Sequence, residues 1–221
     1  MRIKRIELLT NDIIQTKLFY TRTLQFSIQY ETNNSISFKT GASILTFRQD
    51  NSILSPVYHF AFNIPHNQLE EAIIWMTGKA ELLSVTSESK TADFSHWNAN
   101  AVYFSDNSGN ILELIARHDL DNGSDTPFSS DSIQCISEIG IAVDNVPLFM
   151  DCAIKDHGLN IFSKQQPQEK FAALGDDNGL LIIAETDRNW FPTSVPARKF
   201  PTGIVLGNGN NEEDIQLAIH L

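Results

Sequence analysis

The sequence predicts an α+β fold built from repeated βαβββ units. Three observations carry this prediction: short segments that alternate as strands do, single segments with the spacing of an amphipathic helix, and the recurrence of the same order at intervals of roughly 50–70 residues. A hydrophobic content of 42% and a charged content of 19% are ordinary for a folded globular chain. The 221 residues are enough for one large domain or two small ones.

The first unit begins with a strand pattern and continues with a helix. Asn11 and Asp12 supply an N-cap between the two, and the helical pattern ends near Leu24. Turn residues such as Gly41 then separate three further strand patterns. The predicted elements are a strand over 3–9, a helix over 13–24, and strands over 26–30, 35–39 and 43–48.

The second unit repeats this order. Pro65 and the residues after it begin a helix that Gly78 closes, and a turn with Gly109 joins the last two strands. The predicted elements are a strand over 58–64, a helix over 68–76, and strands over 82–85, 101–105 and 111–116, of which 82–85 has the weakest pattern.

A polar stretch without periodicity separates a third unit from the first two. We expect residues 1–118 to form a domain of two units, 119–132 to be a linker, and 133–221 to be an incomplete second domain. The third unit is predicted as a strand over 136–143, a helix over 146–155, and strands over 160–163, 170–174 and 180–184. A fourth unit begins with a strand over 203–207 and a short helix over 212–218.

The charge balance excludes one broad class of function. The formal net charge is −11, whereas nucleic-acid binding depends on basic side chains that neutralise phosphates. No apolar run approaches the length of a membrane span, and the first residues lack the pattern of a signal peptide. Two cysteines, Cys135 and Cys152, are too few for a disulfide scaffold. We therefore expect a cytoplasmic protein that binds neither nucleic acid nor membranes.

Three motifs resemble the vicinal oxygen chelate superfamily, which includes glyoxalases, extradiol dioxygenases, epimerases, and fosfomycin and bleomycin resistance proteins. Residues 12–26 are similar to its first helix, 59–65 to its fifth strand, and 97–115 to its "Y-F-x-D-P-x-G-N-x-x-E-L" signature, although Gln25 and Asn107 replace the usual Gly and Pro. The resemblance implies paired βαβββ units that curl an eight-stranded sheet into a glyoxalase-like cup. It also implies lyase or dioxygenase chemistry, and a homodimer is a further expectation.

The resemblance also implies a divalent metal, such as Fe, Mn, Ni or Zn, held by side chains of strands one, five and eight. The fifth-strand ligand corresponds to His59, and the eighth-strand ligand corresponds to Glu113, which is also the candidate catalytic residue. Such ligands leave neighbouring positions of the metal open to two vicinal oxygens of a substrate. The first-strand position, seven residues before Asp12, is Arg5.

Arg5 departs from the pattern because a guanidinium offers no lone pair to a metal. One alternative is that Glu7, on the same face of the strand, serves as a displaced ligand with His59 and Glu113. The other is that Arg5 pairs with Glu113 in a metal-free cup and clamps an anionic substrate. The second alternative is favoured, because a slip of two residues would disturb the strand register.

The other assignments are less specific. Trp97 is a candidate for the lining of the cup, and the segment 187–192 is read as an aromatic-anchored loop over a neighbouring sheet. No ligand triad is recognisable in the third unit, so we expect it to be structural or dimer-forming. The predicted function is a small-molecule-binding cup with metal-dependent chemistry on vicinal oxygens. A metal-free binding or sequestering protein, and an interaction module that keeps only the scaffold, remain alternatives.

Overall fold

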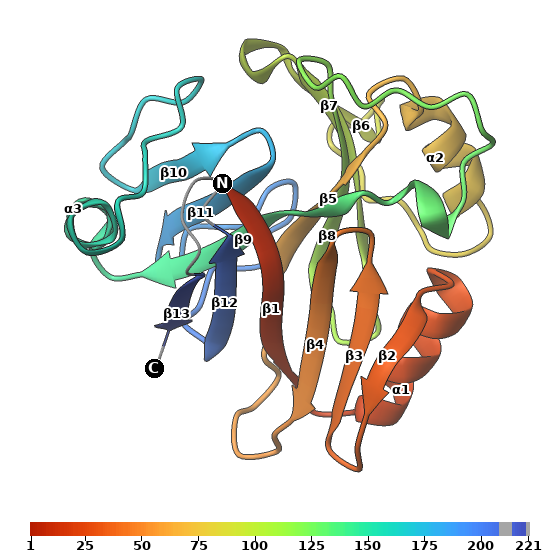
Figure 1. Cartoon of the computed structure of the whole chain (residues 1–221), viewed down its shortest axis with the longest axis horizontal. Coiled ribbons are helices and arrows are strands. Elements are labelled where there is room, and N and C mark those ends of the chain that lie inside the picture. The colour runs from red at the N-terminus through yellow and green to blue at the C-terminus, as the bar shows by residue number, and fades with distance from the viewer. Residues whose placement is uncertain (208–213, 220–221) are drawn as a thin grey trace.

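The computed structural model describes residues 1–207 and 214–219, which form two curled β-sheets and a small number of helices (Figure 1). The predicted α+β class with βαβββ units is confirmed. The two sheets contain six and seven strands, and the inward side chains of both contribute to one hydrophobic core that includes Ile6, Phe47, Phe60 and Leu112.

The six-stranded sheet combines the first unit with the start of the fourth. Its order is β13-β12-β1-β4-β3-β2. The strands are β1 (Arg2–Thr10), β2 (Ser27–Glu31), β3 (Ser35–Thr40), β4 (Ser43–Gln49), β12 (Thr202–Gly207) and β13 (Ile215–Ile219). Strand β1 runs antiparallel to β12 and parallel to β4, so the first strand of the chain lies at the junction of the two units.

The seven-stranded sheet combines the second and third units in the order β10-β11-β9-β5-β8-β7-β6. The strands are β5 (His59–Ile64), β6 (Thr91–Phe94), β7 (Ala99–Ser105), β8 (Ile111–Arg117), β9 (Cys135–Val143), β10 (Phe171–Asp176) and β11 (Gly179–Glu185). Antiparallel pairing of β5 with β9 joins the two units. Each sheet therefore takes strands from both sides of residues 119–132, and the sheets do not follow the expected division into 1–118 and 133–221.

Three α-helices follow the first strands of their units: α1 (Ile13–Leu18), α2 (Leu69–Met76) and α3 (Val146–His157). Asp12 caps α1 as predicted, because its Oδ1 accepts the backbone N–H of Gln15 at 2.9 Å, and the helix continues as a π-helical turn, η1 (Phe19–Thr23). Short 3₁₀ turns occur at η2 (Ser95–Trp97) and η3 (Ser130–Ser132). Among the described residues, no helix is long and apolar enough to span a membrane.

Some local predictions differ from the structure. Residues 82–85 form only one β-bridge, between Leu82 and Phe104, and the strand of this region is β6 instead. Residues 160–163 likewise form one bridge, between Ile161 and Leu174. The predicted helix over 212–218 lies partly outside the described residues, and its residues from Ile215 on belong to strand β13. Pairing with β12 overrides the local helical pattern there.

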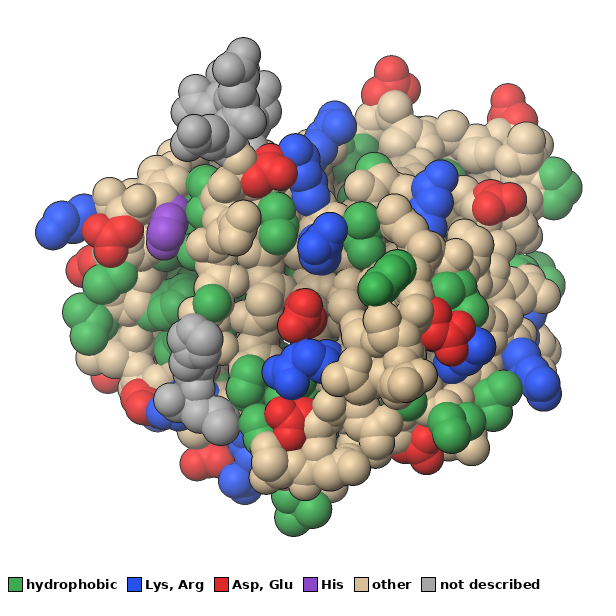
Figure 2. All heavy atoms as spheres, turned by 60° about the horizontal axis from the view of Figure 1, so that its bottom comes forward, with side chains coloured by type: hydrophobic (Ala, Val, Ile, Leu, Met, Phe, Trp, Pro, Cys, Tyr) green, Lys and Arg blue, Asp and Glu red, His purple; other side chains and the backbone are tan. Residues whose placement is uncertain are grey.

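Acidic and basic side chains are interspersed on the face of the molecule seen in Figure 2. Exposed ion pairs on and beside the six-stranded sheet include Arg48 with Glu7 at 3.6 Å and Lys4 with Asp214 at 2.6 Å. Such pairs stabilise a fold only weakly, because solvent screens them. The seven-stranded sheet differs, since β5 and β8 are buried along their whole length on both faces.

Candidate functional site

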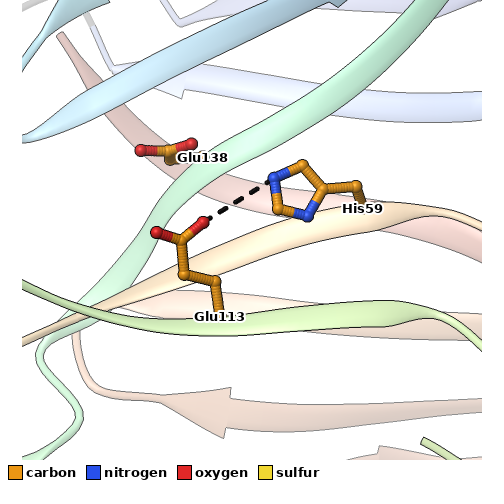
Figure 3. Close-up of side chains that lie close together, drawn as sticks. All are labelled: His59, Glu113 and Glu138. Carbon is orange, nitrogen blue, oxygen red and sulfur yellow. Dashed lines mark ion pairs between the residues drawn. The ribbon is translucent and has the colours of Figure 1, made fainter. Parts of the chain in front are cut away.

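Three buried ionisable side chains meet at the centre of the seven-stranded sheet. Glu113 of β8 and Glu138 of β9 both pair with Ala61 of β5, from opposite sides, and His59 precedes Ala61 by two residues. Residues in register, or two apart on one strand, point to the same face of a sheet. The three side chains therefore share one face, here called the cup face (Figure 3). Their candidate ligand atoms all lie within 4.8 Å of one another.

His59 is held in one orientation. Its Nδ1 lies 3.1 Å from the backbone oxygen of Ile111, and its Nε2 lies 3.7 Å from Oε2 of Glu113. Burial lowers the pKa of His59 to about 4, so the imidazole is neutral at neutral pH. Because a carbonyl can only accept, Nδ1 carries the proton and Nε2 keeps its lone pair. That lone pair faces the carboxylates.

The two glutamates differ in their partners. Burial, with repulsion from Glu138, raises the pKa of Glu113 well above its usual range, and the Tyr103 hydroxyl opposes part of that rise. Burial also raises the pKa of Glu138, but an ion pair with Arg117 opposes that rise. The cup face thus holds one carboxyl group that favours its proton and one whose charge has a resident counter-ion.

Arg117 anchors Glu138. Its side chain is fully buried at the end of β8, and it donates through Nη2 to Oε1 of Glu138 and through Nε to Oδ1 of Asn63 at 3.2 Å. Nη1 lies 3.4 Å from Oδ1 of Asp177. These contacts fix one oxygen of Glu138 and leave the other oxygen of that carboxylate available to a further partner.

A cavity of about 500 Å³ opens above this group. Small residues on the cup face, Ala61 and Ala101 among them, leave room for it. Gly140 on β9 lets the Trp190 ring pack directly on the sheet, since a Cβ there would lie 2.7 Å from Cη2 of that ring. The cavity is lined by His59, Phe94, His96, Trp97, Tyr103, Glu113, Glu138, Lys164, Gln165, Gln166, Gln168, Phe171, Ile182, Arg188, Trp190 and Phe191.

The structure brings together some of the predicted site residues. His59 and Glu113 lie side by side, and Trp97 is buried in the cavity wall. Arg5 and Glu7 are not brought to this site: both are exposed on β1, in the other sheet, where Glu7 lies near Arg48. The expected pair of Arg5 with Glu113 is therefore absent from the described residues, and Glu138 occupies the place beside His59 and Glu113 that was expected for Glu7.

Glu138 is the site residue that sequence reasoning missed. The seven-residue offset, applied from Asp144, indicates Ser137, which is adjacent to Glu138. The third unit was expected to be structural or dimer-forming, but it contributes Glu138 and Trp190 to the cavity. A charged residue within the apolar strand pattern of β9 was the available signal, since a buried carboxylate needs a partner.

Comparisons with known proteins support the fold. No family model matches the chain, and no curated protein matches it in sequence. Among solved structures, a "putative dioxygenase" from Bacillus subtilis is similar with a TM-score of 0.62 and 14% identity over 83% of this chain. Glyoxalase I from Zea mays is similar with a TM-score of 0.55 and 14% identity over 99% of this chain and 72% of its own.

The V278E variant of the Zea mays enzyme is similar with a TM-score of 0.57 and 14% identity over 89% of this chain and 70% of its own. The chain spans 63% of the length of the Bacillus subtilis protein. At these identities the likeness concerns the fold alone. The chain has a glyoxalase-like fold, as its three sequence motifs predicted.

Proposed function

We propose that this chain is a metal-dependent enzyme that acts on a small molecule with two neighbouring oxygen atoms. The observation that carries the proposal is the convergence of His59, Glu113 and Glu138 at the base of a cavity of about 500 Å³. A cavity of this size encloses a compound of one or two rings. The structural neighbours include a glyoxalase and a "putative dioxygenase", names that stand for two different reactions, so the reaction type stays open between these two classes.

The three side chains fit a divalent cation. One imidazole and two carboxylates suit Fe, Mn, Ni or Zn, and three protein ligands leave positions for a substrate. The hydrogen bond of His59 to Ile111 orients the ring as a ligand requires. A bound divalent cation would act here as a Lewis acid towards the substrate oxygens.

The side chains of the chain have separate tasks in this proposal. Glu113 takes or returns a substrate proton at a carboxylate oxygen, and the Tyr103 hydroxyl stabilises its ionised form. Arg117 keeps Glu138 in position. The aromatic wall, which includes Trp190, restricts water around the reacting atoms. Each residue's task is inferred from the contacts that its side chain makes.

A metal-free binding protein is the second candidate, and one observation favours it. Arg117 already supplies a positive charge to Glu138, and Glu113 favours its protonated form, so the group is close to charge balance without a cation. This alternative replaces the one based on Arg5, which is exposed on the other sheet.

Metal content separates the two candidates. The 221-residue protein is stripped with a chelator, incubated in turn with Fe²⁺, Mn²⁺, Ni²⁺ and Zn²⁺, and desalted, and its metal content is then measured by elemental mass spectrometry. We expect about one metal per chain, and much less in His59→Ala. His96→Ala is the matched control, because His96 also lines the cavity but lies outside the ligand group. A folded protein that retains none of the four metals would overturn the metal-dependent function.

A further inference from the structure

Arg188 has no acidic partner among the described residues, although the chain carries 27 acidic side chains against 16 basic ones. It lies in the cavity lining, on the segment that follows β11. Its guanidinium carbon is 4.7 Å from the centre of the Phe171 ring. Stacking on a ring holds the guanidinium plane while its N–H groups remain free to bind a planar oxyanion with two hydrogen bonds.

The other long basic side chain of the lining is neutralised. Nζ of Lys164 lies 2.7 Å from both Asp119 and Asp177, and it also donates to the backbone oxygen of Trp97 at 3.1 Å. Its three donors are thereby used. Within the described part of the chain, Arg188 is therefore the basic side chain of the cavity lining that remains free to bind a ligand.

The walls between Arg188 and the carboxylate group are aromatic. Phe191 lies 5.5 Å from Tyr103 and 6.0 Å from Phe94, and Trp190 lies 5.4 Å from His59, measured between ring centres. Such walls favour a flat apolar body. The indole N–H groups of Trp97 and Trp190 are buried and have no hydrogen-bond partner in the described structure.

The charges also orient a ligand. Glu138 is already paired with Arg117, so the group at the base offers an anion no free positive charge, whereas Arg188, beside Phe171 on the edge strand β10, attracts it. We infer that the cavity binds a small aromatic anion, with its carboxylate or other oxyanion on Arg188 and its ring against Phe191, Tyr103 and Trp190. Contact of further ligand oxygens with His59, Glu113 and Glu138 rests on the proposed function. Recognition of the anion by Arg188 does not.

Two probes of similar size test this inference: 1-naphthoate, which is an anion, and 1-naphthalenemethanol, which is neutral. Binding is followed by tryptophan fluorescence and calorimetry, with the protein first in chelator, so that the result does not depend on a metal. We expect 1-naphthoate to bind about tenfold more tightly than the alcohol, because one charge-assisted pair at a half-open site contributes about that factor. Its advantage should shrink as salt is added.

Three variants locate the contact. Arg188→Met should reduce 1-naphthoate binding about tenfold and leave the alcohol unchanged, and Arg188→Lys should restore part of the loss. Arg198→Met is the matched control, since Arg198 is exposed on the same segment but does not line this cavity. An unchanged 1-naphthoate affinity in Arg188→Met, or an equal affinity of the wild type for both probes, would overturn the inference.

The same titration is repeated after loading with the metal that the chain retains. Failure of metal binding with a preserved preference for 1-naphthoate would sink the proposed function and support the anion site. Metal binding without a preference for 1-naphthoate would support the proposed function and overturn the anion site.

Discussion

Arg117 and Glu138 form an ion pair in the interior of the seven-stranded sheet, where the Arg117 side chain is 0% exposed and that of Glu138 is 4% exposed. The two residues belong to the second and third units, so the pair joins both halves of the sheet. A buried charge that loses its partner is costly, whereas a buried pair replaced by apolar side chains often is not.

Arg117→Met should therefore lower the free energy of unfolding by about 3 to 5 kcal/mol. The double variant Arg117→Met with Glu138→Leu should recover most of this loss, because no carboxylate is then left without a partner. Arg48→Met, which removes an exposed ion pair with Glu7, is the control and should change the free energy of unfolding by less than about 1 kcal/mol. Urea denaturation measures all three, and a double variant no more stable than the single one would contradict this explanation.

Glu138 and Glu7 provide a direct comparison of the structural and sequence-based assignments of the third ligand. Glu138→Gln should lower the affinity for a divalent metal at least tenfold, because it removes a charged ligand from a group of three. Glu7→Gln should leave the affinity unchanged, since Glu7 is exposed on the other sheet. Calorimetric titration with Mn²⁺ measures both, and the reverse pattern would restore the first-strand assignment.

The low pKa of His59 predicts how stability depends on pH. In the unfolded chain this histidine takes up a proton near pH 6.5, but in the folded chain it does so only near pH 4. Between these values the unfolded state binds more protons, so stability is full above pH 6.5 and is lost as the pH falls towards 4. The loss amounts to about 3 kcal/mol at most.

The His59→Gln variant lacks this group and should lose less stability than the wild type over the same range. Chemical denaturation at pH 7 and pH 4.5, with chelator present, measures the difference. Parallel losses in the two proteins would show that His59 is not the source of the pH dependence.

Gly140 has a different kind of importance, because the Trp190 ring rests on it. Gly140→Ala should displace the ring and destabilise the protein by about 1 to 3 kcal/mol. The tryptophan fluorescence of this variant should shift to longer wavelength, because the displaced Trp190 indole contacts water. Gly203→Ala on β12 is the control, since the new Cβ would meet only Glu7, at 3.2 Å from its Cβ and 4.0 Å from its backbone oxygen. Unchanged emission in Gly140→Ala would mean that the cavity wall adapts without loss.

The fold and two members of the candidate ligand group could be predicted because their signals are local. His59 and Glu113 each lie in a motif, and the first helix has its own cap, Asp12, and apolar spacing. Glu138 joins them through the pairing of β5 with β9, in which Ala61 lies opposite Glu138. Nothing within either strand specifies that partner, so the offset from Asp144 led instead to Ser137.

Long-range strand pairing also explains why Arg5 lies away from the candidate site. Its position before the first helix matches the resemblance, but β1 pairs with β4 and β12, and this places it in the sheet that lacks His59 and Glu113. The segment with Trp190 was conspicuous in composition. Its contact with Gly140, however, is made in three dimensions and leaves no periodic trace in the sequence.

The pairing of units has a consequence for the integrity of the molecule. Because the first unit pairs with the fourth and the second with the third, the two halves of the chain are interlocked, and each half holds an incomplete part of both sheets. A protease cut within 119–132 would leave two fragments, neither of which contains His59 and Glu138 together. The complete ligand group would then exist only when the fragments reassociate, as in a split reporter whose signal measures reassembly.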